Sequence, residues 1–220
     1  MSEHGRCSPA VTTRRLSAFL VLAAAVACGG GGDPAPDPAP ALPALVDGGS
    51  VQDAHQVGTT FFADGATATG GTGSPVAGID CAASELTATK FTHLSIVRDG
   101  QPLAIPGRVG VVRDNAGNLV CVYSIHTHTD DRSGRIHTEG PVPATYNLGQ
   151  FFAIWGMPLQ SNNVAGITDK PLTAVYVVDN DTVTPFTGDP ATIELTSHRH
   201  IVLQLGTAIT RIPVYTWNGP

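Results

Sequence analysis

One stretch of sequence decides how this chain folds: Ser124-Ile125-His126-Thr127-His128-Thr129-Asp130-Asp131-Arg132-Ser133-Gly134-Arg135-Ile136-His137-Thr138-Glu139. It reads as a β-hairpin, with a turn at Asp131–Gly134, because turns favour Asp at the first position and Gly at the last. Side chains on a strand alternate between its two faces. His126 and His128 therefore share a face, as do His137 and Glu139, which predicts a metal-binding face on the hairpin.

The register of this hairpin follows from the position of its turn. With the turn centred on Asp131–Gly134, His126 faces Glu139 and His128 faces His137. Directly opposed Cβ atoms lie about 4.5–5.5 Å apart, so three imidazoles and a carboxylate can converge on one divalent ion. A bulge at Gly134 would slip the register by one residue and weaken this geometry.

Three further histidines are candidate ligands. His198 and His200 repeat the His-x-His spacing, and His93 points away from the core if its neighbours Leu94 and Ile96 face the core. A single histidine is more often an exposed or hydrogen-bonded structural residue than a ligand. Two His-x-His pairs and a His-x-Glu in one small domain favour the metal interpretation, although the second pair can equally lie far from the hairpin.

The donor set favours Cu(II) or Zn(II) as the cofactor, because imidazole-rich sites suit both ions. A Cu(I) site is disfavoured, since Met157 is the only methionine outside the first 27 residues and no free cysteine is expected. Glu139 is either a fourth ligand or an acceptor that fixes the tautomer of an imidazole. The spacing of these residues differs from that of a cupin.

The N-terminus reads as a targeting segment. Residues 1–27 combine three arginines with a 12-residue apolar run, Leu16 to Ala27, which is too short for a stable membrane anchor. The run ends in Ala25-Val26-Ala27-Cys28, which resembles a bacterial lipobox. That resemblance implies a lipoprotein signal peptide over 1–27 and lipidation of Cys28; cleavage nearby by an ordinary signal peptidase is the alternative.

Residues 28–50 form a predicted tether, since glycines and then alternating Pro, Ala and Asp cannot bury a core. By the same resemblance, Gly29 favours the outer membrane, with the domain in the periplasm or at the cell surface. Export would let Cys81 and Cys121 form a disulfide, the alternative being two buried free thiols.

Charge limits the choice of partners. Without residues 1–27, which hold three Arg and one Glu, the 12 basic and 18 acidic residues become 9 and 17, a formal charge of −8. This argues against nucleic acid and against an anionic membrane surface as partners. We therefore expect a metal ion as ligand and membrane contact through the N-terminal lipid only, while no protein partner is indicated.

Residues 51–220 are expected to fold as a single β-rich globular domain, because they are rich in Val, Thr, Ile, Gly and Pro. Leu148 to Gly156 has the spacing of one short helix, with Asn147 as N-cap and Gly156 as its stop. The predicted fold class is α+β, mostly β, with antiparallel sheets and one short helix, either β-grasp-like or a small sandwich or barrel. The predicted strands are 91–98, 101–105, 109–113, 119–128, 135–139, 174–178, 191–195, 200–205 and an edge strand at 209–216.

The region 79–206 also resembles an uncharacterised family of secreted or lipid-anchored bacterial and archaeal domains. The family pattern is close to H-T-H-D-x-x-G-x-I-H-x-E followed by L-G-x-F-F-x-x-W-G. This chain departs from it with Thr129-Asp130-Asp131 where the pattern has a single Asp. The residues that carry the resemblance are His126, Thr127, His128, Gly134, Ile136, His137, Glu139, Leu148, Gly149, Phe151, Phe152, Trp155 and Gly156.

The resemblance implies membership of this family and no particular activity. Three functional hypotheses follow from the residues. The first is an extracytoplasmic lipoprotein domain that binds a transition metal through the hairpin. The second is a metalloenzyme, hydrolytic or oxygen-using, at the same site, with Glu139 as general base or fourth ligand. The third is a structural or interaction domain whose histidines only form hydrogen bonds. We favour binding over catalysis.

Overall fold

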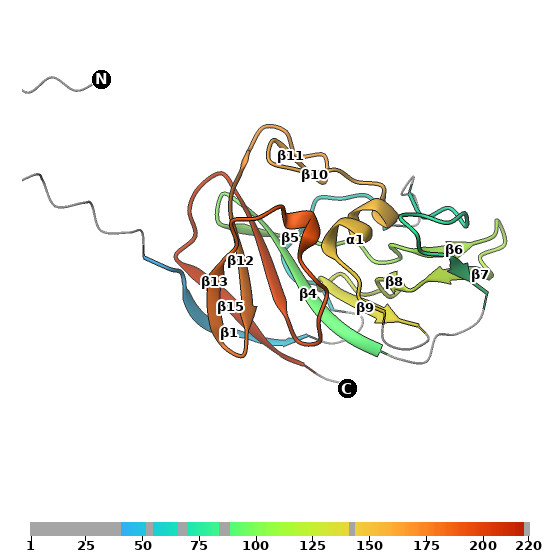
Figure 1. Cartoon of the computed structure of the whole chain (residues 1–220), viewed down its shortest axis with the longest axis horizontal. Helices are drawn as coiled ribbons and strands as arrows, with labels where there is room; N and C mark the ends of the chain where they lie inside the picture. The colour runs from blue at the N-terminus through green and yellow to red at the C-terminus, as the bar shows by residue number, and fades with distance from the viewer. Residues whose placement is uncertain (1–40, 52–54, 66–69, 84–88, 141–143, 218–220) are drawn as a thin grey trace, which may run out of the picture. The chain divides into compact units, whose positions relative to one another are not determined.

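The computed structural model describes residues 41–51, 55–65, 70–83, 89–140 and 144–217. The predicted signal peptide, Cys28 and most of the predicted tether lie outside these ranges. In the described residues the chain is mostly β with one α-helix, as Figure 1 shows, and the predicted fold class is confirmed. The elements are β1 (Ala44–Val51), β2 (Thr59–Thr60), β3 (Cys81–Ala82), β4 (Thr89–Arg98), β5 (Gln101–Ala104), β6 (Val111–Arg113), β7 (Leu119–Tyr123), β8 (Ile125–His126), β9 (Arg135–Glu139), α1 (Leu148–Trp155), β10 (Leu159–Gln160), β11 (Asn163–Val164), β12 (Leu172–Asp179), β13 (Thr182–Pro185), a 3₁₀ helix (Pro190–Thr192), β14 (His200–Leu205) and β15 (Arg211–Trp217).

The long strand β4 organises the large sheet (Figure 1). On one side it pairs in parallel with β14, and on the other its first half pairs with β9 and its second half with β5, both antiparallel. The described strands of this sheet follow the order β13-β12-β14-β4-β5-β2, and β8 and β9 extend it beside β4. Most neighbours are antiparallel; the β14–β4 and β2–β5 pairs are parallel.

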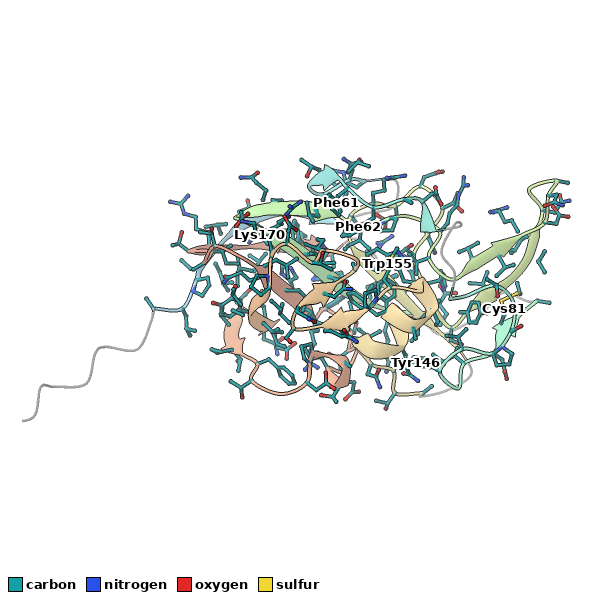
Figure 2. The ribbon with its side chains drawn as sticks, turned by 90° about the horizontal axis from the view of Figure 1, so that it is seen from above. Phe61, Phe62, Cys81, Tyr146, Trp155 and Lys170 are labelled. Atoms are coloured by element: carbon teal, nitrogen blue, oxygen red, sulfur yellow. A yellow bond between two sulfur atoms is a disulfide. The ribbon has the colours of Figure 1, made fainter. Side chains whose placement is uncertain are left out.

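One face of this sheet carries the main core. Leu94 and Ile96 of β4 point to this face and are almost fully buried, as is Ile136 of β9. Helix α1 packs here through apolar side chains at helical spacing, and Phe62 meets the ring of Trp155 edge to face at 5.0 Å (Figure 2). The buried side chains of α1 are Leu148, Phe151, Phe152, Ile154 and Trp155.

The predicted helix is confirmed together with its ends. Asn147 accepts a hydrogen bond from the backbone N–H of Gln150, and the Gln150 side chain accepts one from the N–H of Asn147, a reciprocal capping box. Gly156 ends the helix in the left-handed region, with φ of 73°, which a residue without a Cβ adopts at little cost.

The opposite face of the sheet is covered by a two-stranded ribbon in which β1 pairs in parallel with β15. Val97, Val178, Val202 and Ile212 are buried between the ribbon and the sheet. β1 occupies residues 44–51, so residues 44–50 of the predicted tether form part of a strand of the fold. β15 pairs with β1 among the described strands, which agrees with the predicted edge strand.

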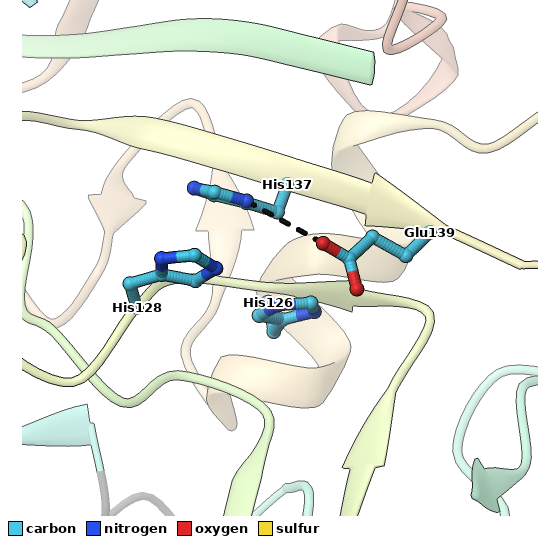
Figure 3. A group of neighbouring side chains, drawn as sticks. All are labelled: His126, His128, His137 and Glu139. Carbon is cyan, nitrogen blue, oxygen red and sulfur yellow. Dashed lines mark ion pairs between the residues drawn. The ribbon is translucent and has the colours of Figure 1, made fainter. Parts of the chain in front are cut away.

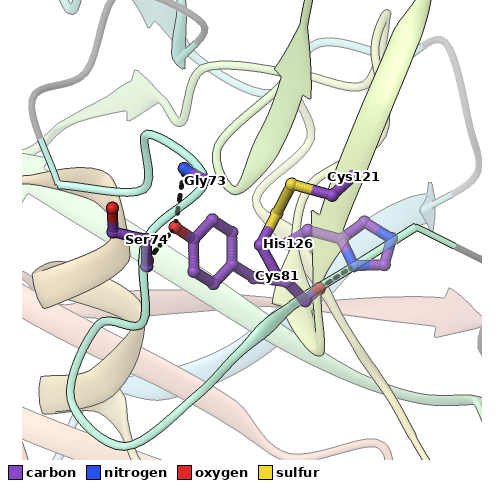
Figure 4. Close-up of a disulfide and its surroundings, with 6 residues drawn as sticks. Gly73, Ser74, Cys81, Cys121 and His126 are labelled. Atoms are coloured by element: carbon purple, nitrogen blue, oxygen red, sulfur yellow. Dashed lines mark hydrogen bonds between the residues drawn. A yellow bond between two sulfur atoms is a disulfide. The ribbon is translucent and has the colours of Figure 1, made fainter.

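A three-stranded sheet, β3-β7-β6, projects beside the main sheet (Figure 1). The predicted disulfide is present: Cys81 of β3 is bonded to Cys121 of β7, as Figure 4 shows. It closes a loop with a sequence separation of 40, worth about 4 kcal/mol in the loop-entropy model. The disulfide fixes the strand that leads directly into the hairpin histidines.

Two predicted strands differ from the structure. Residues 191–195 were expected to be extended, but Pro190–Thr192 forms a 3₁₀ helix, because Asp189 caps the N–H of Ala191 and proline occupies the first turn. The strand predicted over 119–128 divides at Ser124 into β7 and β8. No helix among the described residues is long and apolar enough to cross a bilayer.

Candidate metal centre

The hairpin forms, but its register differs from the predicted one. β8 and β9 pair so that His126 faces His137 and Ile125 faces Thr138. The predicted pairs, His126 with Glu139 and His128 with His137, are therefore wrong by two residues. An even shift leaves each side chain on its original face, so the histidines still gather on one side of the sheet.

The register is set by the segment after His126, which pairs with residues 106–109 instead of continuing along β9. Thr127 donates its backbone N–H to the carbonyl of Val109, and its hydroxyl donates to the carbonyl of Pro106 while accepting from the N–H of Val109. His128 therefore lies in the connection beyond β8, and its carbonyl accepts from the N–H of Arg108. The strand pairing of β8 is limited to two residues for this reason.

The return into β9 depends on a tight approach at Gly134. Its φ is 91°, and a Cβ at this position would collide with the carbonyl oxygen of Leu94. Asp131 accepts from the N–H of Ser133 at 2.9 Å and so shapes the preceding turn. This turn allows β9 to lie directly beside β4.

Four side chains, those of His126, His128, His137 and Glu139, converge beside the paired strands β8 and β9 (Figure 3). One ligand atom from each of His126, His128, His137 and Glu139 can be chosen so that all four lie within 4.8 Å of one another. The His128 and His137 rings stack with centroids 3.6 Å apart, and the His126 ring lies 5.4 Å from that of His137. His126 and His137 are buried, while His128 and Glu139 are partly exposed, which leaves a route to solvent.

The ring of His126 is oriented by a backbone group. Its Nδ1 lies 3.0 Å from the carbonyl oxygen of Tyr123 (Figure 4). Because a carbonyl only accepts hydrogen bonds, Nδ1 carries the proton and the lone pair of Nε2 is left for a ligand. Metal-bound histidines commonly donate their second N–H to a carbonyl in this way.

The electrostatics of the group favour a neutral His126 imidazole beside an ionised Glu139 carboxylate. Burial lowers the pKa of His126 to about 4; Glu139 opposes this shift, while His137 and His128 add to it. Burial would raise the pKa of Glu139, but the hydrogen bond and charge of His137 and the neighbouring imidazoles outweigh it and lower that pKa. At neutral pH His126 therefore presents a nitrogen lone pair and Glu139 an anionic oxygen, the forms that bind metals.

An aromatic ring closes the site on the side of β4. The ring of Phe91 contacts that of His137 edge to face, with centroids 4.8 Å apart. The guanidinium of Arg135 lies over Phe91 at 4.7 Å and is paired with the buried carboxylate of Asp131 at 3.6 Å. The metal group is thus separated from this ion pair by an apolar ring, which holds His137 in place.

The other candidate histidines lie outside this group. His93 of β4 and His200 of β14 face each other, with ring centroids 4.5 Å apart, and both contact Tyr215 of β15. His93 points away from the core, as predicted, and its Nε2 donates to the carbonyl of Ser133. His198 is exposed and stacks on Trp217.

Two contributors to the site were not among the predicted residues. Tyr123 acts through its backbone carbonyl, a group that every residue type has, so the sequence does not indicate it. Phe91 lies two residues before His93 on the same face of β4, so the alternation of the strand could have indicated it. Comparison of the chain with protein-family models, with curated proteins and with solved structures finds no match.

Proposed function

We propose that this protein binds one transition-metal ion, Cu(II) or Zn(II), through His126, His128, His137 and Glu139. The observation that carries the proposal is the convergence of four donor groups within 4.8 Å, one of them with its tautomer fixed by a backbone carbonyl. Three nitrogens and one oxygen match the donors that both ions accept.

The number of donors supports a binding role, namely capture, storage or transfer of the metal. Four protein ligands complete a tetrahedral shell, whereas a catalytic zinc site keeps one position open. We further propose that the domain works outside the cytoplasm, anchored at the outer membrane through Cys28. The Cys81–Cys121 disulfide supports an oxidising compartment.

A metalloenzyme is the second candidate, and the pairing of Glu139 with His137 favours it. Glu139 Oε1 lies 3.7 Å from Nδ1 of His137, a geometry that also suits an acceptor which orients an imidazole. Three imidazoles would then hold the metal, and a metal so held supplies Lewis-acid activation of water. Glu139, ionised and partly exposed, would serve as general base.

Metal binding is tested on the purified full-length protein by elemental mass spectrometry and by titration with Cu(II) and Zn(II). We expect one tightly bound equivalent, which the variant His128→Ala loses while its circular dichroism spectrum stays unchanged. His198→Ala is the matched control, because it removes an exposed imidazole outside the group. The proposal would be refuted if His128→Ala bound the metal as tightly as the parent, or if the parent bound neither ion with a dissociation constant below the micromolar range.

The variant Glu139→Gln distinguishes the two candidates. If Glu139 is the fourth ligand of a closed site, metal affinity should drop by more than about 100-fold. If it orients His137, affinity should drop by about 10- to 100-fold, as for other outer-sphere partners. In that case hydrolytic activity toward activated esters becomes the next measurement.

A further inference from the structure

A second site lies between the main sheet and the β1–β15 ribbon, on the face that carries the metal group but at the other end of β4. A cavity of about 210 Å³ opens there, lined by side chains from β4, β14 and β15. Protein interiors are close-packed and hold few voids larger than a water molecule. A cavity of about 150 Å³ is known to admit a benzene ring, so this one has room for a small organic molecule.

The walls of the cavity are apolar. Val97, Val202, Ile209 and Ile212 line it, and Pro213 contributes a wall without a backbone donor. Val202 and Ile212 are almost fully buried. An occupant must therefore bring an apolar body to replace the missing packing.

Three polar groups interrupt these walls. Ser95 and His200, both buried, line the cavity, and Ser95 Oγ and His200 Nε2 are hydrogen bonded at 2.9 Å. Tyr215 lines it as well, and burial raises the pKa of its hydroxyl to about 12, so that the hydroxyl stays protonated. Apolar walls with a few placed polar groups are the usual composition of a small-molecule site.

Arg211 adds a positive charge at the exposed end. This residue lines the cavity and is exposed, and its guanidinium forms no ion pair or hydrogen bond with any residue that the structure describes. A guanidinium matches the two oxygens of a carboxylate better than any other side chain does. From these observations we propose that the cavity binds a small carboxylic acid whose apolar body is one aromatic ring or a short alkyl chain.

In the bound state the carboxylate meets Arg211 at the mouth, and the apolar body lies among Val97, Val202 and Ile212. Ser95 and Tyr215 provide hydroxyls for a polar substituent at the inner end. The site shares no residue with the metal group, so the proposal does not depend on metal binding.

Titration calorimetry of the full-length, chelator-treated protein tests the proposal, with benzoate and hexanoate as probes and benzyl alcohol and hexan-1-ol as their uncharged counterparts. We expect both carboxylates to bind with a Kd below 1 mM and the alcohols at least about tenfold more weakly, as for loss of a charged hydrogen bond. Arg211→Gln should weaken carboxylate binding by about tenfold. Ile209→Trp, which fills the cavity, should abolish binding of all four probes.

Two control variants separate this site from other sources of binding. Arg113→Gln removes an exposed arginine on β6 and should change nothing. His128→Ala disrupts the metal group and should also leave carboxylate binding intact. The proposal is overturned if neither carboxylate binds, if the alcohols bind equally well, if Arg211→Gln or Ile209→Trp has no effect, or if His128→Ala removes the binding.

Discussion

The buried imidazole of His93 predicts how the stability of this fold depends on pH. Burial lowers the pKa of His93 from 6.5 to about 4, and the hydrogen bond to the Ser133 carbonyl opposes this shift only in part. In the unfolded chain the same imidazole titrates near 6.5. Between these values the unfolded state binds a proton that the folded state excludes, so the free energy of unfolding decreases as the pH is lowered through this window.

The size of the effect follows from the shift. A difference of about 2.5 pH units at 1.36 kcal/mol per unit amounts to about 3 kcal/mol. This stability is fully present above about pH 6.5 and is lost by about pH 4. The slope near pH 5 due to His93 alone is about 1.2 kcal/mol per pH unit, because the unfolded state binds about 0.9 proton more than the folded state there. His126 and His200, whose pKa values burial also lowers, make the slope of the whole protein steeper.

Urea unfolding of chelator-treated protein from pH 4.5 to 7.5 measures this slope. In His93→Gln, which keeps a donor for the Ser133 carbonyl, we expect a slope lower by about 1.2 kcal/mol per pH unit near pH 5. Val175→Ala is the control, because it trims the main core without removing a titrating group, and its curve should run parallel to that of the parent. Equal slopes in the parent and in His93→Gln would refute the reasoning.

Three further predictions concern the metal, the disulfide and the turn. The metal that the protein binds, added at a free concentration of 100 times its Kd, should raise the free energy of unfolding of the parent by about 2.7 kcal/mol. The calorimetric Tm should then rise by about 5–10 °C, and His128→Ala should not show this rise. Alkylation of the unfolded, unreduced protein should label neither Cys81 nor Cys121 in a peptide map, and reduction should lower the free energy of unfolding by about 4 kcal/mol; labelling of either cysteine contradicts the bond. Gly134→Ala should lower the free energy of unfolding in urea by about 3 kcal/mol or more, because its new Cβ meets the Leu94 carbonyl. Gly117→Ala has a similar φ of 87° but lies in open space, and should lower it by about 1–2 kcal/mol. Equal losses in the two variants would mean that backbone strain alone matters.

Local patterns in the sequence were sufficient for the helix and for several strands. The capping box at Asn147 and the stop at Gly156 act within a few residues, so they can be read directly from the chain. β1 gave no such signal, because its Asp-Gly-Gly segment is poor in strand-forming residues. It is extended because β15 pairs with it from the other end of the chain. The parallel pairing of β4 with β14 likewise joins segments far apart in sequence, which no local pattern specifies.

The metal group could be predicted although the register of its hairpin could not. Face alternation depends only on whether a shift is odd or even, so a shift of two residues left His126 and His137 on the same side. Which residues lie opposite one another, by contrast, changes with every shift in register. The predicted pairing of His128 with His137 as strand residues failed because Thr127 bonds to the 106–109 segment and takes His128 out of β8. His128 reaches His137 from this connection instead, with its ring stacked at 3.6 Å.

A donor on a connecting segment can move toward an ion more easily than one fixed in a sheet. The partly exposed His128 is therefore the ligand through which we expect the metal to enter and leave, and removing it should raise the dissociation rate more than it lowers the association rate.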